Sequence, residues 1–134
     1  MRKIWILVAH GSLFGCVGPD HMVSDAGRVC VEPEVVEAFE EAGPLLVTVL
    51  LDECISACAN DPEATCTAEL QGDTIVVHSE GQWSDPQEGC IAVCASLQAE
   101  CTLEDVPPGD YTVQHGNETW ALALPSDLDQ ECLQ

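Results

Sequence analysis

The chain has 134 residues, with 24 Asp or Glu, 3 Lys or Arg and 9 cysteines, and its formal net charge is −21. This length corresponds to one domain, and so large an excess of acid excludes nucleic acid and electrostatic docking on anionic lipid as binding modes. Apolar residues make up 46% of the chain, which excludes a disordered acidic tail, but only 4% of residues are aromatic. We therefore expect covalent cross-links to support a core poor in large side chains.

Residues 1–16 have the pattern of an export signal. Arg2 and Lys3 precede an apolar run over 4–9 that is too short to cross a bilayer as a helix. The segment ends in Leu-Phe-Gly-Cys over 13–16, which resembles the lipobox of bacterial lipoproteins. The resemblance implies that residues 1–15 are a signal peptide and that Cys16 is acylated and becomes the mature N-terminus. A secreted protein without an anchor is the alternative.

The lipobox resemblance also implies a location. Acyl chains hold a protein on a membrane through their own burial, so the expected membrane contact is the lipid anchor alone. Val17, not Asp, follows the cysteine, and by analogy with lipoprotein sorting this favours the outer membrane of a bacterial cell envelope. Cleavage would remove Arg2 and Lys3 and leave Arg28 as the one Lys or Arg against 24 acids.

Residues 16–28 contain Gly, Pro, Asp and Ser without apolar periodicity, which predicts a tether, so we expect the domain to span 29–134. Residues 33–42 fit a short helix or an irregular strand equally well, and both alternatives stay open. The apolar run over 45–51 does not alternate, which predicts a core strand covered on both faces.

Two β-hairpins are predicted from alternating apolar residues. The first covers 65–79, with Gln71-Gly72-Asp73 as its turn. The second covers 111–124 around a turn at 116–117. Its inward-facing residues are Tyr111, Val113, Trp120, Leu122 and Leu124.

The segment before the second hairpin, Val-Pro-Pro-Gly-Asp-Tyr-Thr-Val over 106–113, resembles the Pro-Gly-x-Tyr-x-Val entry to a late strand in prealbumin-like and Cna B-type β-sandwich domains. Pro108 and Gly109 suit a tight turn, and Tyr111 can pack its ring while its hydroxyl bonds to the backbone. The resemblance and the several short strands predict a mainly β protein, a small disulfide-stapled immunoglobulin-like β-sandwich.

Apart from Cys16, the chain has an even number of cysteines. In an exported chain this density predicts four disulfides. The eight residues concerned are Cys30, Cys54, Cys58, Cys66, Cys90, Cys94, Cys101 and Cys132. Thiolate zinc sites with His21, His78 or His115 are the rival interpretation, but the Cys-x2-Cys spacing typical of zinc is absent. We therefore expect no metal and no cofactor.

The cysteine spacings repeat within the chain. Cys54-x3-Cys58 followed by Cys66 is matched by Cys90-x3-Cys94 followed by Cys101. The Cys-x3-Cys spacing puts two thiols one helical turn apart, which predicts short helical turns there and disulfides to other partners. We expect each unit to be closed internally, by Cys58–Cys66 and Cys94–Cys101.

Candidate catalytic residues are few. His78 adjoins Ser79 and Glu80, but neighbouring strand residues point to opposite faces and cannot act as base and nucleophile. His21 in the tether and His115 at a turn are expected to be solvated. We therefore predict that the protein is not an enzyme and has no catalytic residue.

Two other features have both a structural and a functional interpretation. Residues 52–53 and 60–63 offer oxygen ligands for calcium, but the spacing of an EF-hand loop is missing. Trp83 is expected in the core at a strand end, the alternative being an exposed platform for carbohydrate or protein.

These observations together predict a membrane-anchored envelope lipoprotein that is a monomeric, non-catalytic binding or structural module with a strongly acidic surface. Its expected partner is a basic protein or an envelope glycan. The alternatives are an accessory or inhibitor module for a basic enzyme and a calcium-dependent adhesin domain.

Overall fold

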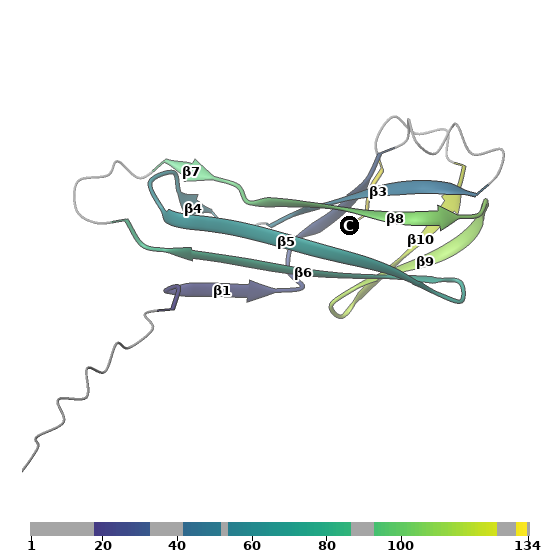
Figure 1. Ribbon diagram of the computed structural model, residues 1–134, viewed down its shortest axis with the longest axis horizontal. Helices are drawn as coiled ribbons and strands as arrows, with labels where there is room; N and C mark the ends of the chain where they lie inside the picture. Colours follow the sequence, from purple (N-terminus) through teal and green to yellow (C-terminus); the bar gives the residue numbers. More distant parts are fainter. Residues whose placement is uncertain (1–17, 33–41, 52–53, 87–92, 126–130, 134) are drawn as a thin grey trace, which may run out of the picture.

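The computed structural model describes residues 18–32, 42–51, 54–86, 93–125 and 131–133. Within these ranges the protein is mainly β, with eleven strands in three sheets and no helix. The signal segment and most of the 33–42 segment lie outside the described residues. Figure 1 shows strands from the two larger sheets lying over one another in a sandwich-like arrangement.

The first sheet has five strands. Its central strand is β6. β5 pairs along one edge of β6, while β1 and β9 pair with different parts of its other edge, and β10 follows beyond β9. The strands are β1 (His21–Ser24), β5 (Asn60–Gln71), β6 (Thr74–Ser84), β9 (Gly109–His115) and β10 (Glu118–Leu124). All pairs are antiparallel except β6 with β9, which run parallel.

The second sheet has four strands in the order β11-β2-β3-β8, all antiparallel. They are β2 (Arg28–Val31), β3 (Gly43–Leu50), β8 (Gln98–Val106) and β11 (Glu131–Leu133). A separate two-stranded sheet pairs β4 (Ile55–Ser56) with β7 (Cys94–Ala95). It lies at one end of the molecule in Figure 1.

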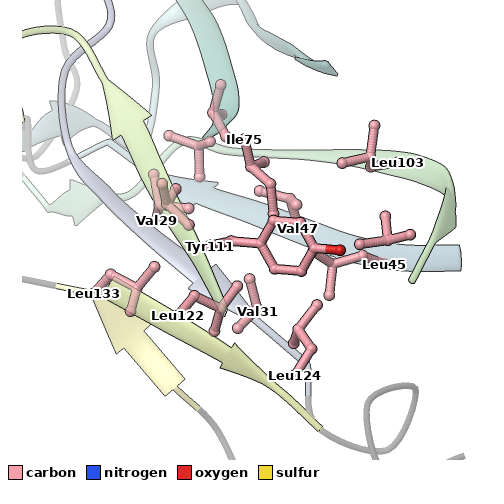
Figure 2. Packing of buried hydrophobic residues seen from close by; sticks show 14 residues of the cluster. Val29, Val31, Leu45, Val47, Ile75, Leu103, Tyr111, Leu122, Leu124 and Leu133 are labelled. Atoms are coloured by element: carbon pink, nitrogen blue, oxygen red, sulfur yellow. The ribbon is translucent and has the colours of Figure 1, made fainter. Parts of the chain in front are cut away.

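The hydrophobic core lies between the two larger sheets, because every second residue of each strand points inward. Figure 2 shows these side chains converging around the Tyr111 ring. The cluster consists of Val29, Val31, Leu45, Val47, Val49, Ile75, Val77, Leu103, Val106, Tyr111, Val113, Leu122, Leu124 and Leu133. Most are aliphatic, which fits the low aromatic content.

The apolar run over 45–51 forms β3 as predicted, but it is not covered equally on both faces. Leu45, Val47 and Val49 are buried, whereas the alternate residues are half-buried. The outer face of a two-layer sandwich has no third layer above it. The alternating burial is therefore what a central strand of this architecture shows.

Both predicted hairpins are confirmed with their register. In the first, Ala68 pairs with Val77 and Gly72 occupies the turn with φ of 63°. In the second, Leu122 pairs with Tyr111, and both are buried. Trp120 is half-buried and packs against the edge of the core.

The segment predicted as a tether contains a strand. β1 pairs with the end of β6, and the chain then passes to β2 in the other sheet. The crossing needs a sharp change of direction, which Asp25 and Gly27 provide with φ of 48° and 96°. Asp25 holds the corner, since its backbone N–H donates to the Ser79 carbonyl at 2.8 Å. The described β structure therefore begins at His21 and not at Val29.

The Tyr111 hydroxyl donates a hydrogen bond to the Pro107 carbonyl, as the strand-entry motif predicts. Replacing Tyr111 by phenylalanine keeps the packed ring and removes this bond, so we expect a loss of about 1 kcal/mol in the free energy of unfolding. Denaturant unfolding measures this loss. Thr112→Ala, at an exposed neighbouring position, should change stability by less than about 0.5 kcal/mol. Equal losses in both variants would contradict the role of the hydroxyl.

The disulfides are formed, but the predicted closure within each repeat unit is wrong. The structure has Cys30–Cys132, Cys54–Cys94 and Cys66–Cys101. Cys58 is also disulfide-bonded, and Cys90 lies outside the described residues. The Cys66–Cys101 bond joins β5 to β8, so it connects the two large sheets. The repeat units are therefore linked to each other.

The predicted helical turns at the Cys-x3-Cys segments are also wrong in the described part of the chain. Residues 55–56 form β4 and residues 94–95 form β7, and Ile55 pairs with Ala95. Pairing the two units as antiparallel strands brings Cys54 and Cys94 together, with 5.1 Å between their Cα atoms. A contact between the two units thus replaces the local helical geometry.

Candidate functional site

The most polar group near the core lies where β1 and β9 meet the same edge of β6. The parallel β6–β9 pairing ends at Val77 opposite His115, and the β6–β1 pairing begins at Glu80 opposite Ser24. Ser79 lies in the gap between them. Its side chain points inward, as do the side chains of Val77 and of His115 at the end of β9.

Ser79 and His115 form a buried hydrogen bond. The distance between Ser79 Oγ and His115 Nε2 is 2.8 Å, and each residue is only 2% exposed. Burial lowers the pKa of His115, and His78 lowers it further, while the nearby Asp25 carboxylate acts in the opposite direction. A neutral imidazole is the form that such an environment favours.

Asp25 completes the group from the β1 corner. Its Oδ1 accepts the backbone N–H of Ser79 at 2.9 Å, and its Oδ2 lies 3.5 Å from His78 Nδ1. In a serine hydrolase the carboxylate orients the histidine ring that activates the serine. Here the carboxylate binds the serine backbone and an exposed histidine instead. Ser79 and His115 therefore form a buried polar pair, and Asp25 fixes the turn after β1 to the Ser79 backbone.

The prediction that His78 and Ser79 point to opposite faces of the strand is confirmed. His78 is exposed and Ser79 is buried. The expectation that His115 is solvated is wrong. β9 continues to His115 with strict alternation, so this residue shares the inward face of Tyr111 and Val113. Counting every second residue from Tyr111 would have placed His115 inside.

His21 is half-exposed and belongs to β1. Its ring stacks on Trp83, with 5.2 Å between the centroids, and its Nε2 lies 2.9 Å from Asp85 Oδ1. Trp83 is 8% exposed, so the prediction of a core residue at a strand end is confirmed. Asp20 Oδ2 accepts the backbone N–H of Asp85 at 2.9 Å, which fixes the chain just before β1.

A hollow of about 340 Å³ opens beside this junction, over β5, β6 and the end of β1. Its walls combine carboxylates, hydroxyls and one imidazole with apolar surface, and the carboxylates suit a cationic group. The lining residues are Ser24, Asp25, Thr65, Cys66, Thr67, His78, Ser79 and Glu80. Among the described residues, no three His, Cys, Asp or Glu side chains are grouped so as to hold a metal ion.

The buried pair predicts a dependence of stability on pH. Because the pKa of His115 is lower in the folded state than in the unfolded chain, the unfolded chain takes up the proton first as the pH falls. This contribution to stability is present above the unfolded pKa of about 6.5 and is lost as the pH falls below it. We expect the free energy of unfolding to decrease between pH 7.5 and pH 5.5.

The His115→Gln variant tests the origin of that decrease. It should show a smaller decrease over the same pH interval in denaturant unfolding. His21→Gln, which changes an exposed histidine away from this junction, should keep the decrease of the parent protein. If His115→Gln retains the full pH dependence, another group is responsible.

No family model, curated protein or solved structure matches this chain. The predicted acylation site, Cys16, lies outside the described residues. Within the described ranges, no helix has the length and apolar character needed to cross a membrane. The proposals below therefore depend on this chain's own residues.

Proposed function

We propose that the protein is a lipid-anchored, non-catalytic binding or structural module of the bacterial cell envelope. The observation that carries this proposal is the state of the cysteines, because all seven in the described part of the chain are disulfide-bonded. Disulfides of this density are typical of exported proteins. They agree with the export signal and with a separate role for Cys16 as the acylated residue.

The absence of catalysis in this proposal is supported by the geometry of Ser79 and His115. Both side chains are 2% exposed, and the nearest carboxylate bonds to the serine backbone. Ser79 lines the hollow, but its side chain points to the core side of β6, where Oγ is bonded to His115. A positioned nucleophile and base beside a substrate site are what hydrolysis needs.

We also propose a specific type of fold for this mainly β protein. It is an immunoglobulin-like sandwich similar to prealbumin-like and Cna B-type domains. Two features support it: the hydrogen bond from the Tyr111 hydroxyl to the Pro107 carbonyl, and the first strands, which pass from one sheet to the other at Gly27. A tyrosine bonded back to the preceding turn is a recurring feature of such sandwiches.

The partner that the surface favours is basic. Asp25 and Glu80 line the hollow on the first sheet, and a lysine or arginine side chain of a basic protein fits this chemistry. This also favours the inhibitor or accessory role toward a basic enzyme. Binding should weaken steeply as salt rises, because the attraction between exposed charges is screened over about 10 Å at 0.1 M.

Cell fractionation of the Cys16→Ser variant tests the anchor. We expect the parent chain in the outer-membrane fraction and the variant in the soluble fraction. Mass spectrometry should find acyl chains on Cys16 and no residues before it. A variant that fractionates like the parent, or a mature chain that retains Arg2, would refute the anchor.

A further inference from the structure

The described β structure begins only a few residues after Cys16, so the domain is held close to the proposed lipid anchor. Asp20 is fixed to Asp85, and β1 begins at the next residue, His21. Only four residue steps separate Cys16 from Asp20, which span at most about 14 Å when fully extended. A flexible tether over the whole of 16–28 would have allowed a distance between anchor and domain several times as long.

β1 is held to the domain at both ends. At its start, His21 stacks on Trp83 and contacts Asp85. At its far end, Asp25 exchanges two hydrogen bonds with the Ser79 backbone, at 2.8 Å and 2.9 Å. These contacts keep the distance to the anchor short.

The start of β1 lies at the end of the molecule that carries the β4–β7 sheet (Figure 1). Asn60, shortly after β4, donates to the Asp85 carbonyl at 3.1 Å, and Ala57 donates to the Val93 carbonyl at 2.8 Å. We call this the anchor end and define it as residues 18–22, 57–61, 83–86 and 93–95.

The anchor end carries exposed apolar side chains. Met22 is 68% exposed and Val93 is 57% exposed. The remaining large hydrophobic residue exposed in the described ranges, Leu70, is 36% exposed and lies near the β5–β6 turn, far along the strands from Trp83. Two of the three large hydrophobic residues exposed in the described ranges therefore lie at the end where the chain leaves for the anchor.

We infer that the membrane contact, expected from the sequence to be the lipid anchor alone, also includes the anchor end, which rests on the lipid surface with Met22 and Val93 against neutral head groups. This inference rests on the proposed acylation of Cys16. Neutral lipid is the fitting partner because Asp20, Asp61 and Asp85 are exposed at the same end, and they repel anionic head groups. The far end of the strands, near the β5–β6 turn, stays accessible to a protein partner.

Two tryptophans of the mature chain report on this orientation. Trp83 lies at the anchor end, whereas Trp120 pairs with Val113, which in turn pairs with Ile75. Ile75 precedes Trp83 by eight positions in β6, about 26 Å along the strand. Trp83→Phe and Trp120→Phe variants leave one reporter each once cleavage has removed Trp5.

The experiment uses the mature acylated protein in phosphatidylcholine vesicles that carry a nitroxide on the head group. Co-sedimentation with the vesicles first tests the anchor. Because about 26 Å of strand separates the reporters, we expect the nitroxide to quench Trp83 at least about twofold more than Trp120.

Two changes should weaken the quenching of Trp83 without releasing the protein. One inserts about fifteen Gly and Ser residues between Gly18 and Pro19, which lengthens the tether by about 20 Å on average. The other is Met22→Glu combined with Val93→Glu. Leu70→Glu is the matched control and should leave the quenching unchanged.

The outcomes separate the two proposals. A protein that does not co-sediment refutes the anchor and with it this orientation. A protein that co-sediments but shows equal quenching of both tryptophans refutes the orientation alone. The orientation is also refuted if the anchor end instead forms a dimer whose population rises with protein concentration.

Discussion

Gly27→Ala is expected to reduce the free energy of unfolding by about 3 to 5 kcal/mol, because it combines backbone strain with a steric clash. Gly27 has φ of 96°, a conformation that side-chain-bearing residues rarely adopt. A Cβ atom there would lie 2.1 Å from the Leu50 carbonyl oxygen and 2.8 Å from the Leu51 Cα. Both contacts are with backbone, which cannot rotate away.

Gly72→Ala is the matched control. Gly72 also has positive φ, 63°, but a Cβ at this hairpin turn would meet no atom within 4 Å. Only the backbone strain remains, so we expect a cost of about 1 to 2 kcal/mol. Denaturant unfolding of the two variants measures the difference. Equal losses would mean that the crossing from β1 to β2 is not constrained as the structure indicates.

Removing the Cys30–Cys132 disulfide is expected to cost about 4 to 5 kcal/mol, as the chain-entropy model gives for a loop of this length. The bond joins residues 102 positions apart and closes nearly the whole domain. Cys30 is 1% exposed, so truncation at this position also leaves a cavity. The measurement is denaturant unfolding of the double variant Cys30→Ala, Cys132→Ala.

The double variant Cys54→Ala, Cys94→Ala provides the comparison. This bond spans 40 positions and joins two exposed cysteines, Cys94 in β7 and Cys54 just before β4. The chain-entropy model gives a smaller stabilisation for this shorter loop, and truncating exposed cysteines leaves no buried cavity. We expect a loss below about 4 kcal/mol. A larger loss than in the Cys30 and Cys132 variant would contradict this difference.

The pairing of cysteines illustrates a limit of sequence reasoning. An even number of cysteines and the repeated spacing indicated disulfides, but the repeat suggested closure within each unit. The structure instead joins Cys54 to Cys94 and Cys66 to Cys101, between the units. Disulfide formation depends on the distance between Cα atoms, and that distance is fixed by the pairing of strands far apart in the sequence.

The polar junction shows the same limit. The alternation from Tyr111 was sufficient to place His115 inside, but its partner Ser79 is 36 positions away. Only the parallel pairing of β6 with β9 brings them together, and nothing local specifies that pairing. Asp25 joins the group because β1 adds to the free part of the same strand edge.

The sequence by itself determined the features that short-range chemistry controls. These are the two hairpins with their register, the turn that the Tyr111 hydroxyl closes, the buried positions of Tyr111, Val113, Leu122 and Leu124, and the presence of disulfides. Each depends on residues within a few positions of one another or on composition. The tertiary structure alone decided which cysteines pair, that β1 belongs to the domain and that Ser79 meets His115. These depend on which strands become neighbours, and strand order follows from the burial of all the apolar faces together.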